Sequence, residues 1–576
     1  MAPLDNLAVA RILNEIGDLL ELKGENTFKI RAYRNAADIV AGNAEPVAGL
    51  DLEGLRQWPG IGKDLSARII EICQSGTCLL YQELVAHFPS TLLDLLRLQG
   101  VGPKTVALLY SELRIASLED LEAAARSGRL RELKGMGARK EQLLLRSLEE
   151  RKQHANRHLI PDAADTAAKL IDYLQSRAPG VTFEAVGSLR RGTETCGDID
   201  ILAIGAAPDV MATFTSSPLV ERVLGQGDTK SSVLVRGGYQ ADLRLVPLES
   251  RGAALQYFTG SKPHNIALRD RALERGMRLN EYGLFRALDE VKLAGETEEG
   301  IYEALGLAWI PPELRENRGE FDAAGERRLP ELVQWSDLRG DLHMHTTETD
   351  GKEDLATMVQ AARDQGLEYI AITDHSKALA MANGLDETRA LAHAARIREL
   401  DGRLDGIRVL AGIECDILPD GSLDLADDCL AQLDIVVASV HSALRQEEPE
   451  MTARMVRAIE NPWVDIVAHP TSRALLRREP SKVNIDQLTR AAAAHGVALE
   501  INCQIDRLDL SDVNARTARE RGVKLVISSD AHSRGALALK RWGVLVARRA
   551  WATRNDVLNT MPFEQFRASL RRHRPS

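Results

Sequence analysis

The sequence predicts a multidomain protein with an α-helical N-terminal region, a mixed α+β region and a C-terminal series of βα units. Residues 1–150 repeat apolar side chains at helical spacing, as in LEDLEAAARSGRLREL. From about residue 160, strand-like segments carry carboxylates at alternate positions. Residues 338–576 alternate short apolar strands with helical stretches, which is typical of parallel strands and of a closed barrel. The 576 residues are enough for three or four domains.

Composition limits the setting in which the chain could work. Its formal net charge of −11 argues against a uniformly basic nucleic-acid binder but allows a local basic groove. Six cysteines form no CxxC pair, so we expect neither a disulfide framework nor a thiolate zinc site. The N-terminus has no basic lead-in to an apolar run, and no segment could span a bilayer. We therefore expect a cytoplasmic protein without a membrane partner; that it is a monomer is a separate expectation, which the composition does not test.

A short Gly-x-Gly pattern occurs three times in the helical region, in WPGIGKDLSARII, LQGVGPKTVALLY and LKGMGARKEQLLL. One copy could be an ordinary glycine turn between packed helices, but three copies indicate a repeated device. Glycine lets a phosphate approach the free N–H groups at a helix N-terminus. The copies resemble the helix-hairpin-helix motif of DNA-repair proteins, which implies binding to the DNA backbone. The candidate DNA-binding residues are Gly60, Gly62, Lys63, Gly100, Gly102, Lys104, Gly135 and Gly137.

The stretch GSLRRGTETCGDIDIL, residues 187–202, places two aspartates on one strand face. Asp198 and Asp200 are two residues apart, and alternate strand residues point the same way. Two such carboxylates repel unless a cation lies between them, and Mg²⁺ prefers carboxylates together with substrate phosphates. Asp242, in QADLRLV on a second predicted strand, is the candidate third acid. Taken alone, the pattern could also be a solvated strand face.

The residues before these aspartates could bind a triphosphate. Gly187 and Ser188 offer a backbone N–H and a hydroxyl, and Arg190 and Arg191 offer guanidinium groups. Together with YFTGSKPHNIALRDRAL and RLNEYGLF further along the chain, this stretch resembles the family X DNA polymerases, the group that includes DNA polymerase beta. The resemblance runs from about residue 5 to 310.

This resemblance implies a nucleotidyltransferase palm and thumb. It implies that a primer 3′-hydroxyl attacks the α-phosphate of a dNTP, with Mg²⁺ held by the catalytic residues Asp198, Asp200 and Asp242. Many relatives have an arginine two residues before the third aspartate, where this chain has Gln240, and we expect this to alter how Asp242 is held before metal binding. The implied nucleotide-binding residues are Gly187, Ser188, Arg191, Gly197, Tyr257, Phe258, Gly260, Asn265 and Arg269.

Histidines and acids gather at the ends of the C-terminal strands. DLHMHTTETD places two histidines on one strand face, which is ligand geometry for a transition metal. The lack of paired cysteines favours a hydrolytic site with Zn²⁺ or Mn²⁺, about two or three ions, over a structural one. His393 and His495 lie in helical runs, and we interpret them as ordinary hydrogen-bonded residues. The candidate ligands are His343, His345, Asp350, His375, Glu414, His441, His469, Asp530 and His532.

The C-terminal half resembles the PHP (polymerase and histidinol phosphatase) family, whose nine ligand positions all have a match here. The resemblance implies a distorted seven-stranded (βα)7 barrel with a trinuclear metal site. It also implies metal-dependent hydrolysis of phosphoesters, as a 3′→5′ exonuclease, a 3′-phosphatase or an abasic-site endonuclease. Asp374 and Asp416 neighbour candidate ligands and could either orient them or cap strand ends.

Both resemblances together predict a gap-filling DNA polymerase of DNA repair, acting in base excision repair or end joining on gapped or primer–template DNA and fused to a nuclease. One alternative is a DNA-end-binding PHP phosphoesterase with weak or no polymerase activity, and another is a phosphatase of small metabolites with a DNA tether. The expected domains are two helical DNA-binding parts at 1–90 and 91–155, the palm at 156–250, the thumb at 251–312, a charged linker at 313–337 and the PHP domain at 338–576.

The first Gly-x-Gly helix also predicts an absent activity. Several eukaryotic relatives remove a 5′-deoxyribose phosphate with a lysine in this helix, and the aligned residue here is Arg68. A guanidinium stays protonated and is a very poor nucleophile. Two further positions that are basic in those relatives are Cys78 and Tyr81 here. We therefore expect little or no lyase activity from this helix.

Overall fold

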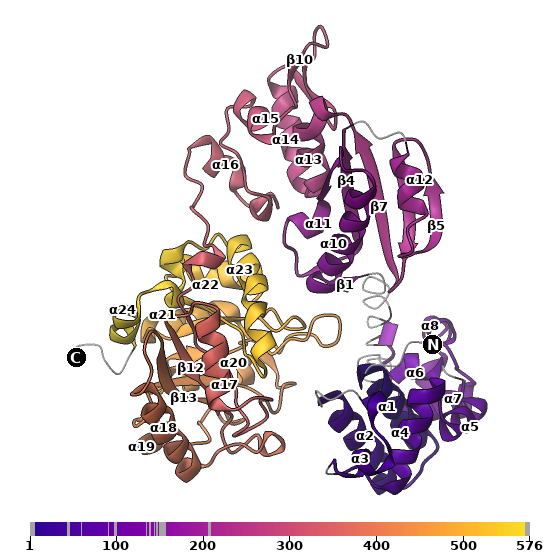
Figure 1. Cartoon of the computed structure of the whole chain (residues 1–576), viewed down its shortest axis with the longest axis vertical. Helices are drawn as coiled ribbons and strands as arrows, with labels where there is room; N and C mark the ends of the chain where they lie inside the picture. Colours follow the sequence, from indigo (N-terminus) through magenta and orange to yellow (C-terminus); the bar gives the residue numbers. More distant parts are fainter. Residues whose placement is uncertain are drawn as a thin grey trace. The chain divides into compact units, whose positions relative to one another are not determined.

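The computed structural model describes residues 6–42, 47–58, 60–89, 91–96, 101–133, 135–137, 140–142, 144, 145, 148, 157–205 and 209–570. These residues form two compact units, Met1–Ala155 and Asn156–Ser576. Figure 1 colours the first unit indigo to purple, and the second unit continues through magenta and orange to yellow. The division falls close to residue 160, where the sequence pattern changes from purely helical to mixed.

The described residues of the first unit are helical, as the apolar spacing predicts. The long helices α1 and α2 lie against each other, and Leu13, Ile16 and Leu20 of α1 are fully buried between the helices. None of the described helices of the chain is long and apolar enough to cross a membrane. The helices are α1 (Asn6–Leu22), α2 (Thr27–Gly42), α3 (Leu52–Arg56), α4 (Lys63–Ser75), α5 (Leu79–His87), α6 (Leu92–Leu96), α7 (Pro103–Leu113) and α8 (Leu118–Arg126).

The palm is built on a five-stranded sheet with the order β2-β4-β7-β6-β5. Only β4 and β7 pair in parallel, and the other neighbours are antiparallel. The apolar face of α10 covers the sheet through Ala163, Leu170 and Leu174, which are fully buried. The elements are α10 (Ile160–Arg177), β2 (Thr182–Ala185), β4 (Asp198–Ile204), α12 (Val210–Thr215), β5 (Val220–Gln226), β6 (Lys230–Val235) and β7 (Tyr239–Val246).

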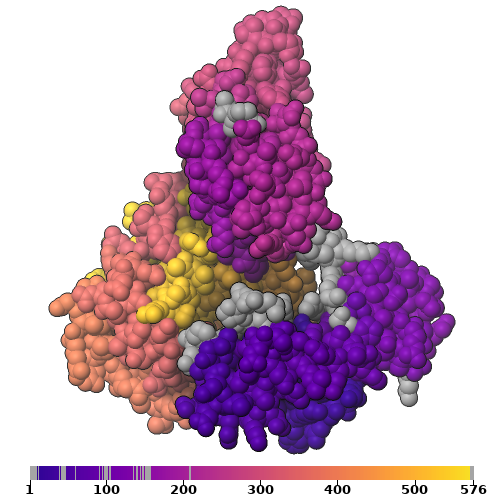
Figure 2. All heavy atoms as spheres, turned by 45° about the vertical axis from the view of Figure 1, so that its right-hand side comes forward, coloured from indigo at the N-terminus to yellow at the C-terminus, as the bar shows by residue number. Residues whose placement is uncertain are grey.

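The thumb combines helices with a small antiparallel sheet of order β10-β9-β8. Its core contains Leu268, Leu284, Ile301 and Tyr302, all fully buried. The small sheet protrudes beyond the thumb helices in Figure 1 and forms a narrow tip in Figure 2. The elements are α13 (Arg251–Thr259), α14 (Lys262–Glu274), β8 (Met277–Asn280), β9 (Gly283–Arg286), β10 (Lys292–Ala294) and α15 (Glu298–Ala304).

The segment after the thumb is packed, which differs from the charged linker expected over 313–337. Arg315 and Glu320 are fully buried in it, and Arg315 NH1 lies 2.6 Å from Glu298 Oε1 of the thumb. Its charged composition resembles that of a solvated linker, but these charges are neutralised in pairs, so the chain can bury them. Its elements are η4 (Pro312–Leu314), α16 (Glu320–Gly325) and η5 (Trp335–Asp337).

Seven parallel strands follow in chain order from β11 to β17, as predicted for a (βα)7 barrel. A parallel bridge between Met344 and Ala531 brings the two ends of the sheet together, so the barrel is nearly closed. The strands are buried on both faces, which explains their continuous apolar runs. They are β11 (Gly340–Asp341), β12 (Tyr369–Ile372), β13 (Arg408–Asp416), β14 (Ile435–Ser439), β15 (Ile466–Val467), β16 (Ala498–Asn502) and β17 (Leu525–Ser528).

Helices separate these strands, as the alternation in the sequence predicts. The largest of them are α17 (Leu355–Asp364), α18 (Glu387–Asp401), α20 (Glu448–Glu460), α21 (Ile485–His495) and α22 (Asp512–Glu520), and α23 (Lys540–Arg549) follows the last strand.

Candidate functional site

The parallel pairing of β4 with β7 brings the three candidate catalytic aspartates together. Asp200 lies directly opposite Asp242, and Asp198 lies opposite Gln240. Because adjacent strands in a sheet are about 4.8 Å apart, the two paired carboxylates stand within reach of one divalent cation. Of the three aspartates, only Asp242 is buried when the whole residue is considered.

A glycine turn brings the backbone close to these acids. Gly187 begins the short helix α11 (Gly187–Arg190) with φ +65°, a conformation that favours glycine. A Cβ atom at this position would lie 2.5 Å from Asp200 Oδ2, so the site requires glycine here. The N-terminal end of α11 therefore lies beside the acids.

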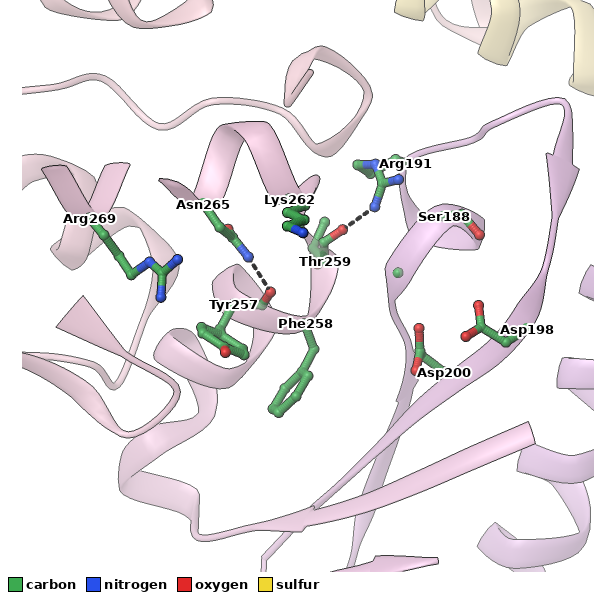
Figure 3. Close-up of a pocket in the computed structure, with 12 residues that line it drawn as sticks. Ser188, Arg191, Asp198, Asp200, Tyr257, Phe258, Thr259, Lys262, Asn265 and Arg269 are labelled. Carbon is green, nitrogen blue, oxygen red and sulfur yellow. Dashed lines mark hydrogen bonds between the residues drawn. The ribbon is translucent and has the colours of Figure 1, made fainter. Parts of the chain in front are cut away.

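Asp198 and Asp200 line a cleft of about 480 Å³ between the palm and the thumb. Figure 3 shows Ser188, Asp198 and Asp200 on one side and the thumb side chains on the other. Asn265 Nδ2 donates a hydrogen bond of 2.6 Å to the Tyr257 carbonyl, which orders the thumb wall. The lining residues are Gly187, Ser188, Arg191, Asp198, Asp200, Tyr257, Phe258, Thr259, Gly260, Lys262, Asn265 and Arg269.

The cleft brings together most of the sequence-predicted nucleotide residues. Gly197 and Asp242 do not line it, although both adjoin its acidic end through β4 and β7. Thr259 and Lys262 line it without having been assigned from sequence. Lys262 follows the helix cap Ser261 in the GSKPHN stretch, so a lysine in the first turn of α14 was the signal available in the sequence.

The first arginine of the RRG motif, Arg190, does not line the cleft. Arg190 forms a fork with Glu298, with NH2 2.7 Å from Oε2 and NH1 2.9 Å from Oε1, and NH1 also donates to Thr259 Oγ1 at 2.6 Å. It is therefore committed to joining the palm to the thumb, and of the two arginines only Arg191 lines the cleft.

The electrostatics of the three aspartates differ. Burial, reinforced by the charges of Asp198 and Asp242, raises the pKa of Asp200 to about 6. Burial also acts on Asp242, but hydrogen bonds from Lys230, Ser232 and Gln240 outweigh it and lower the pKa of that carboxyl. Asp200 thus holds a proton more tightly than an ordinary carboxyl in the absence of a cation.

Gln240 and Lys230 show how the third aspartate is held. Gln240 Nε2 donates to Asp242 Oδ1 at 3.1 Å, and Lys230 Nζ of β6 lies 2.8 Å from Asp242 Oδ2. The positive charge that many family X relatives place two residues before this aspartate comes here from the adjacent strand.

The nine predicted ligands of the C-terminal half converge at the strand ends of the barrel. Glu414 lies at the centre, with its carboxylate oxygens 3.3 Å from His343 Nε2, 2.8 Å from His375 Nδ1 and 3.0 Å from His469 Nε2. Asp350 lies 3.5 Å from both His375 Nε2 and His532 Nε2. Three groups of possible ligand atoms result: His345, Asp350, His375 and His532; His343, His345 and Asp530; and His375, Glu414 and His441.

The donor set fits transition-metal ions. His343 Nε2 and His345 Nδ1 are buried and make no hydrogen bond with the described residues. Burial opposes a charge on His343, yet Asp530, Glu414 and Glu500 raise its pKa. Burial and two neighbouring histidines lower the pKa of His345 to about 4. The buried carboxylates therefore stabilise positive charge at this site, which a metal ion can supply. Imidazole and carboxylate ligands suit Zn²⁺ or Mn²⁺.

Sequence reasoning did not identify Glu500, which orients two of the ligands. Its Oε1 lies 2.8 Å from His343 Nδ1, and its Oε2 accepts from the His469 backbone N–H at 2.7 Å. The side chain is fully buried in β16. A glutamate inside the apolar run VALEINC was the available signal, because a buried charge needs a specific partner.

Asp374 holds the loop that carries two ligands. It accepts hydrogen bonds from Thr346 N at 2.8 Å and from Thr349 Oγ1 at 2.6 Å, between His345 and Asp350. His393 Nε2 lies 2.9 Å from the same carboxylate, so this histidine is a hydrogen-bonded core residue, as interpreted from sequence. The arrangement favours the orienting role for Asp374.

Asp416 contacts a different ligand. Its Oδ1 accepts from the His441 backbone N–H at 3.3 Å, and its Oδ2 lies 3.6 Å from His441 Nδ1. Of the two roles considered for this residue, orienting a ligand is the one that these contacts favour.

Two of the three Gly-x-Gly segments of the first unit lie at the N-termini of described helices. Gly62 precedes α4, and Gly102 precedes α7. Gly60 has φ +94°, and a Cβ there would lie 2.8 Å from Ile39 Cδ1, so the first turn requires glycine. The described DNA-binding candidates Gly60, Gly62, Lys63, Gly102, Gly135 and Gly137 are exposed, whereas Gly100 and the side chain of Lys104 lie outside the described residues.

Five stretches of the chain match models of known families. These are the helix-hairpin-helix domain at 4–78, the SAM-like helix-hairpin-helix tandem at 92–150, the DNA polymerase beta palm at 161–235, the DNA polymerase beta thumb at 254–316 and the PHP domain at 341–504.

Individual relatives cover different lengths of the chain. The DNA polymerase/3′-5′ exonuclease PolX of Bacillus subtilis is 37% identical over 573 residues, which cover 98% of this chain and 99% of that protein. A probable phosphatase of a Thermoanaerobacter species is 30% identical over 38% of this chain and 89% of its own length. A probable phosphatase of a Shewanella species is 33% identical over 33% of this chain and 75% of its own length.

Proposed function

The chain belongs to the PolX family X DNA polymerases that carry a C-terminal PHP domain, and from this premise we propose that it fills short DNA gaps at the palm and trims 3′ ends at the barrel. The register of Asp200 opposite Asp242, beside a cleft of about 480 Å³, carries the polymerase assignment. The convergence of nine nitrogen- and oxygen-bearing side chains carries the nuclease assignment.

In the polymerase reaction, Asp198, Asp200 and Asp242 would hold Mg²⁺. These ions would lower the pKa of the primer 3′-hydroxyl and stabilise the leaving pyrophosphate. Ser188 and Arg191 bind the triphosphate, and Arg191 exchanges its contact with Glu316 Oε1, 3.1 Å away, for phosphate oxygens. Tyr257 and Phe258 line the sugar side of the cleft.

In the nuclease reaction, the nine side chains of the barrel would hold Mn²⁺ or Zn²⁺. Ions of this kind activate a water molecule and stabilise charge on the phosphate. Glu500 and Asp374 keep the ligands in place through the hydrogen bonds described above. The 3′→5′ exonuclease is the activity we assign to this site, and gapped or recessed duplex DNA is its substrate.

Two variants test the division of work on one gapped duplex. Asp200→Asn removes one ligand of the palm, so extension should fall by several orders of magnitude while 3′-end degradation continues. The paired change His343→Ala and His345→Ala removes two ligands of the barrel, so degradation should be lost while extension continues.

The alternatives make different predictions for the same assay. A DNA-end-binding phosphoesterase without polymerase activity would show no extension in the unaltered protein. A phosphatase of small metabolites would hydrolyse a nucleotide monophosphate faster than a recessed DNA 3′ end. Loss of both activities in either variant would contradict the separation of the two sites.

A further inference from the structure

The turn that joins α11 to β4, residues 191–197, includes the two-residue strand β3 (Thr195–Cys196) and carries groups from both ends of the proposed nucleotide site. Arg191 begins the turn, and Gly197 and Asp198 end it. The first two are assigned to the triphosphate and the third to a metal ion. Both ends can engage one nucleotide only if the turn keeps its shape, because a misplacement of about 1 Å can reduce a rate about 100-fold.

The middle of this turn is fixed by the barrel. Arg473, which follows β15, forms a fork with Glu194 of the palm, with NH1 3.0 Å from Oε2 and NH2 2.6 Å from Oε1. The arginine is itself held, since its Nε donates to the Arg507 carbonyl at 2.9 Å and NH2 donates to the Leu508 carbonyl. A two-bond fork of this kind fixes orientation as well as distance.

The start of the turn is fixed by a second arginine of the barrel. Arg549, at the end of α23, donates from NH1 to the Arg191 carbonyl at 3.0 Å and to Glu316 Oε1 at 3.0 Å. Its NH2 donates to Asp512 Oδ2 at 2.8 Å. Glu316 Oε1 also accepts from Arg191 Nε, so Arg549 contacts both the backbone of Arg191 and the partner of its side chain.

A close packing contact accompanies these polar ones. Gly192 has φ +65°, and a Cβ atom there would lie 3.3 Å from the Leu545 side chain of α23. Arg549 and Leu545 lie on the same helix, one turn apart. Three residues of the turn, Arg191, Gly192 and Glu194, thus contact the barrel.

We propose that Arg473 and Arg549 are positioning residues for the polymerase reaction, although they belong to the barrel that holds the nuclease site. They fix the 191–197 turn so that Arg191 reaches the triphosphate while Asp198, which follows Gly197 at the acidic end of the cleft, reaches the metal. This inference rests on the proposed polymerase function. It makes the barrel a structural part of the nucleotide site as well as a separate catalyst.

The alternative is that the two arginines only hold the barrel against the palm, and it predicts a different result. Contacts that only join domains would change the thermal unfolding midpoint and leave the kinetics of the folded protein unaltered. A positioning role predicts a higher KM for the incoming dNTP, because Arg191 lines the cleft in which the triphosphate would bind.

The experiment uses the full chain and single-nucleotide gap filling. The variants are Arg549→Met and Arg473→Met in the barrel and Glu194→Gln in the palm, which keeps the size of the side chain. Arg541→Met, at an exposed position on the same helix α23, is the matched control. We measure kcat and KM for dNTP, equilibrium binding of a non-hydrolysable dNTP to the complex with gapped DNA, 3′-end degradation and the unfolding midpoint.

The expected result is a rise of about tenfold in KM and in the dNTP dissociation constant for Arg549→Met, with Arg541→Met unchanged. Glu194→Gln and Arg473→Met should each raise KM, and their combination should be less than additive because they share one interaction. If all variants bind and extend like Arg541→Met, the inference is overturned. If the unaltered protein itself does not extend a primer, the proposed function fails and the inference fails with it.

Discussion

The palm and the barrel each gather acidic side chains for cations, but they do so in opposite ways. In the palm, few ligands line an open cleft, and Asp242 is paired with Lys230 at 2.8 Å. In the barrel, Glu414 is buried among histidines, and Glu500 and Asp374 orient the surrounding ligands. In the palm, a lysine of the protein partly neutralises the carboxylates, whereas in the barrel the ligands are already assembled around the site.

This difference matches the timing of the two reactions. Mg²⁺ keeps several water molecules and binds strongly only with substrate phosphates, so a sparse carboxylate site is completed by the nucleotide. A transition-metal site with many oriented imidazoles can keep its ions between turnovers. The two sites should therefore differ in how firmly each retains metal.

The largest expected effect comes from removing free metal. After dialysis against metal-free buffer, extension should stop completely and return at once when Mg²⁺ is added with dNTP. The barrel should retain its transition-metal ions, measured by elemental analysis, and 3′-end degradation should persist. The variant His343→Ala with His345→Ala is the control and should lose bound metal. Equal loss of metal-dependent activity from both sites would contradict the expected difference in metal retention.

A smaller effect is expected from Glu500→Gln. The amide cannot hold His343 and the His469 backbone as the carboxylate does, so metal affinity and degradation should fall about 10- to 100-fold. Primer extension should stay within the error of the unaltered protein. Metal titration of the emptied barrel, followed by degradation assays, measures this change.

Glu520→Gln is the matched control for this prediction, because Glu520 is exposed on α22 and pairs only with Arg516 among the described residues. It should leave both activities unchanged. A Glu500→Gln protein that binds metal as tightly as this control would show that His343 does not depend on Glu500.

Lys230→Met should have a modest effect, of the opposite sign. Without the Lys230 ammonium, less positive charge offsets the carboxylate of Asp242, so Asp242 should attract Mg²⁺ more strongly. The Mg²⁺ concentration for half-maximal extension should therefore fall a few-fold. Lys169→Met, at an exposed position on α10, is the control. An increase in the Mg²⁺ requirement would mean that Lys230 is needed to place Asp242 and does not compete with the ion.

Much of the fold and of both sites could be predicted from the sequence, because their signals are local. Strand alternation placed Asp198 and Asp200 on one face, and histidines at strand ends indicated the barrel cluster. Lys230 and Glu194 could not be found in this way, and the run VALEINC indicates that Glu500 needs a partner but not which residue supplies it. Each acts through a partner on another strand or another domain, and sequence spacing does not encode that contact.

The segment 313–337 shows a related limit. Its charges and prolines are typical of a linker, yet Arg315 is fully buried against Glu298. Composition reports how many charges a segment has but not whether each will find a partner. Buried ion pairs therefore remain the feature that sequence reading most easily misplaces.

The smallest expected effect concerns the first unit, which contains neither metal site. We expect no lyase reaction there. Borohydride reduction on an incised abasic duplex should capture no covalent adduct in α4. Arg68, the residue aligned with the lysine of lyase-active relatives, forms an ion pair with Glu71 at 3.0 Å, and its guanidinium cannot act as the amine.

Lys63 is the residue of α4 most able to form such an adduct in place of the missing lysine. It begins α4, five residues before Arg68, and a displaced lysine could attack the sugar aldehyde. However, a lysine is activated as a nucleophile by burial or by a neighbouring cation, and Lys63 is exposed. Trapping should therefore be equal in the unaltered protein and in Lys63→Ala. Efficient capture that maps by peptide mass to residues 58–80, and disappears in Lys63→Ala, would give the helical unit a metal-free reaction of its own.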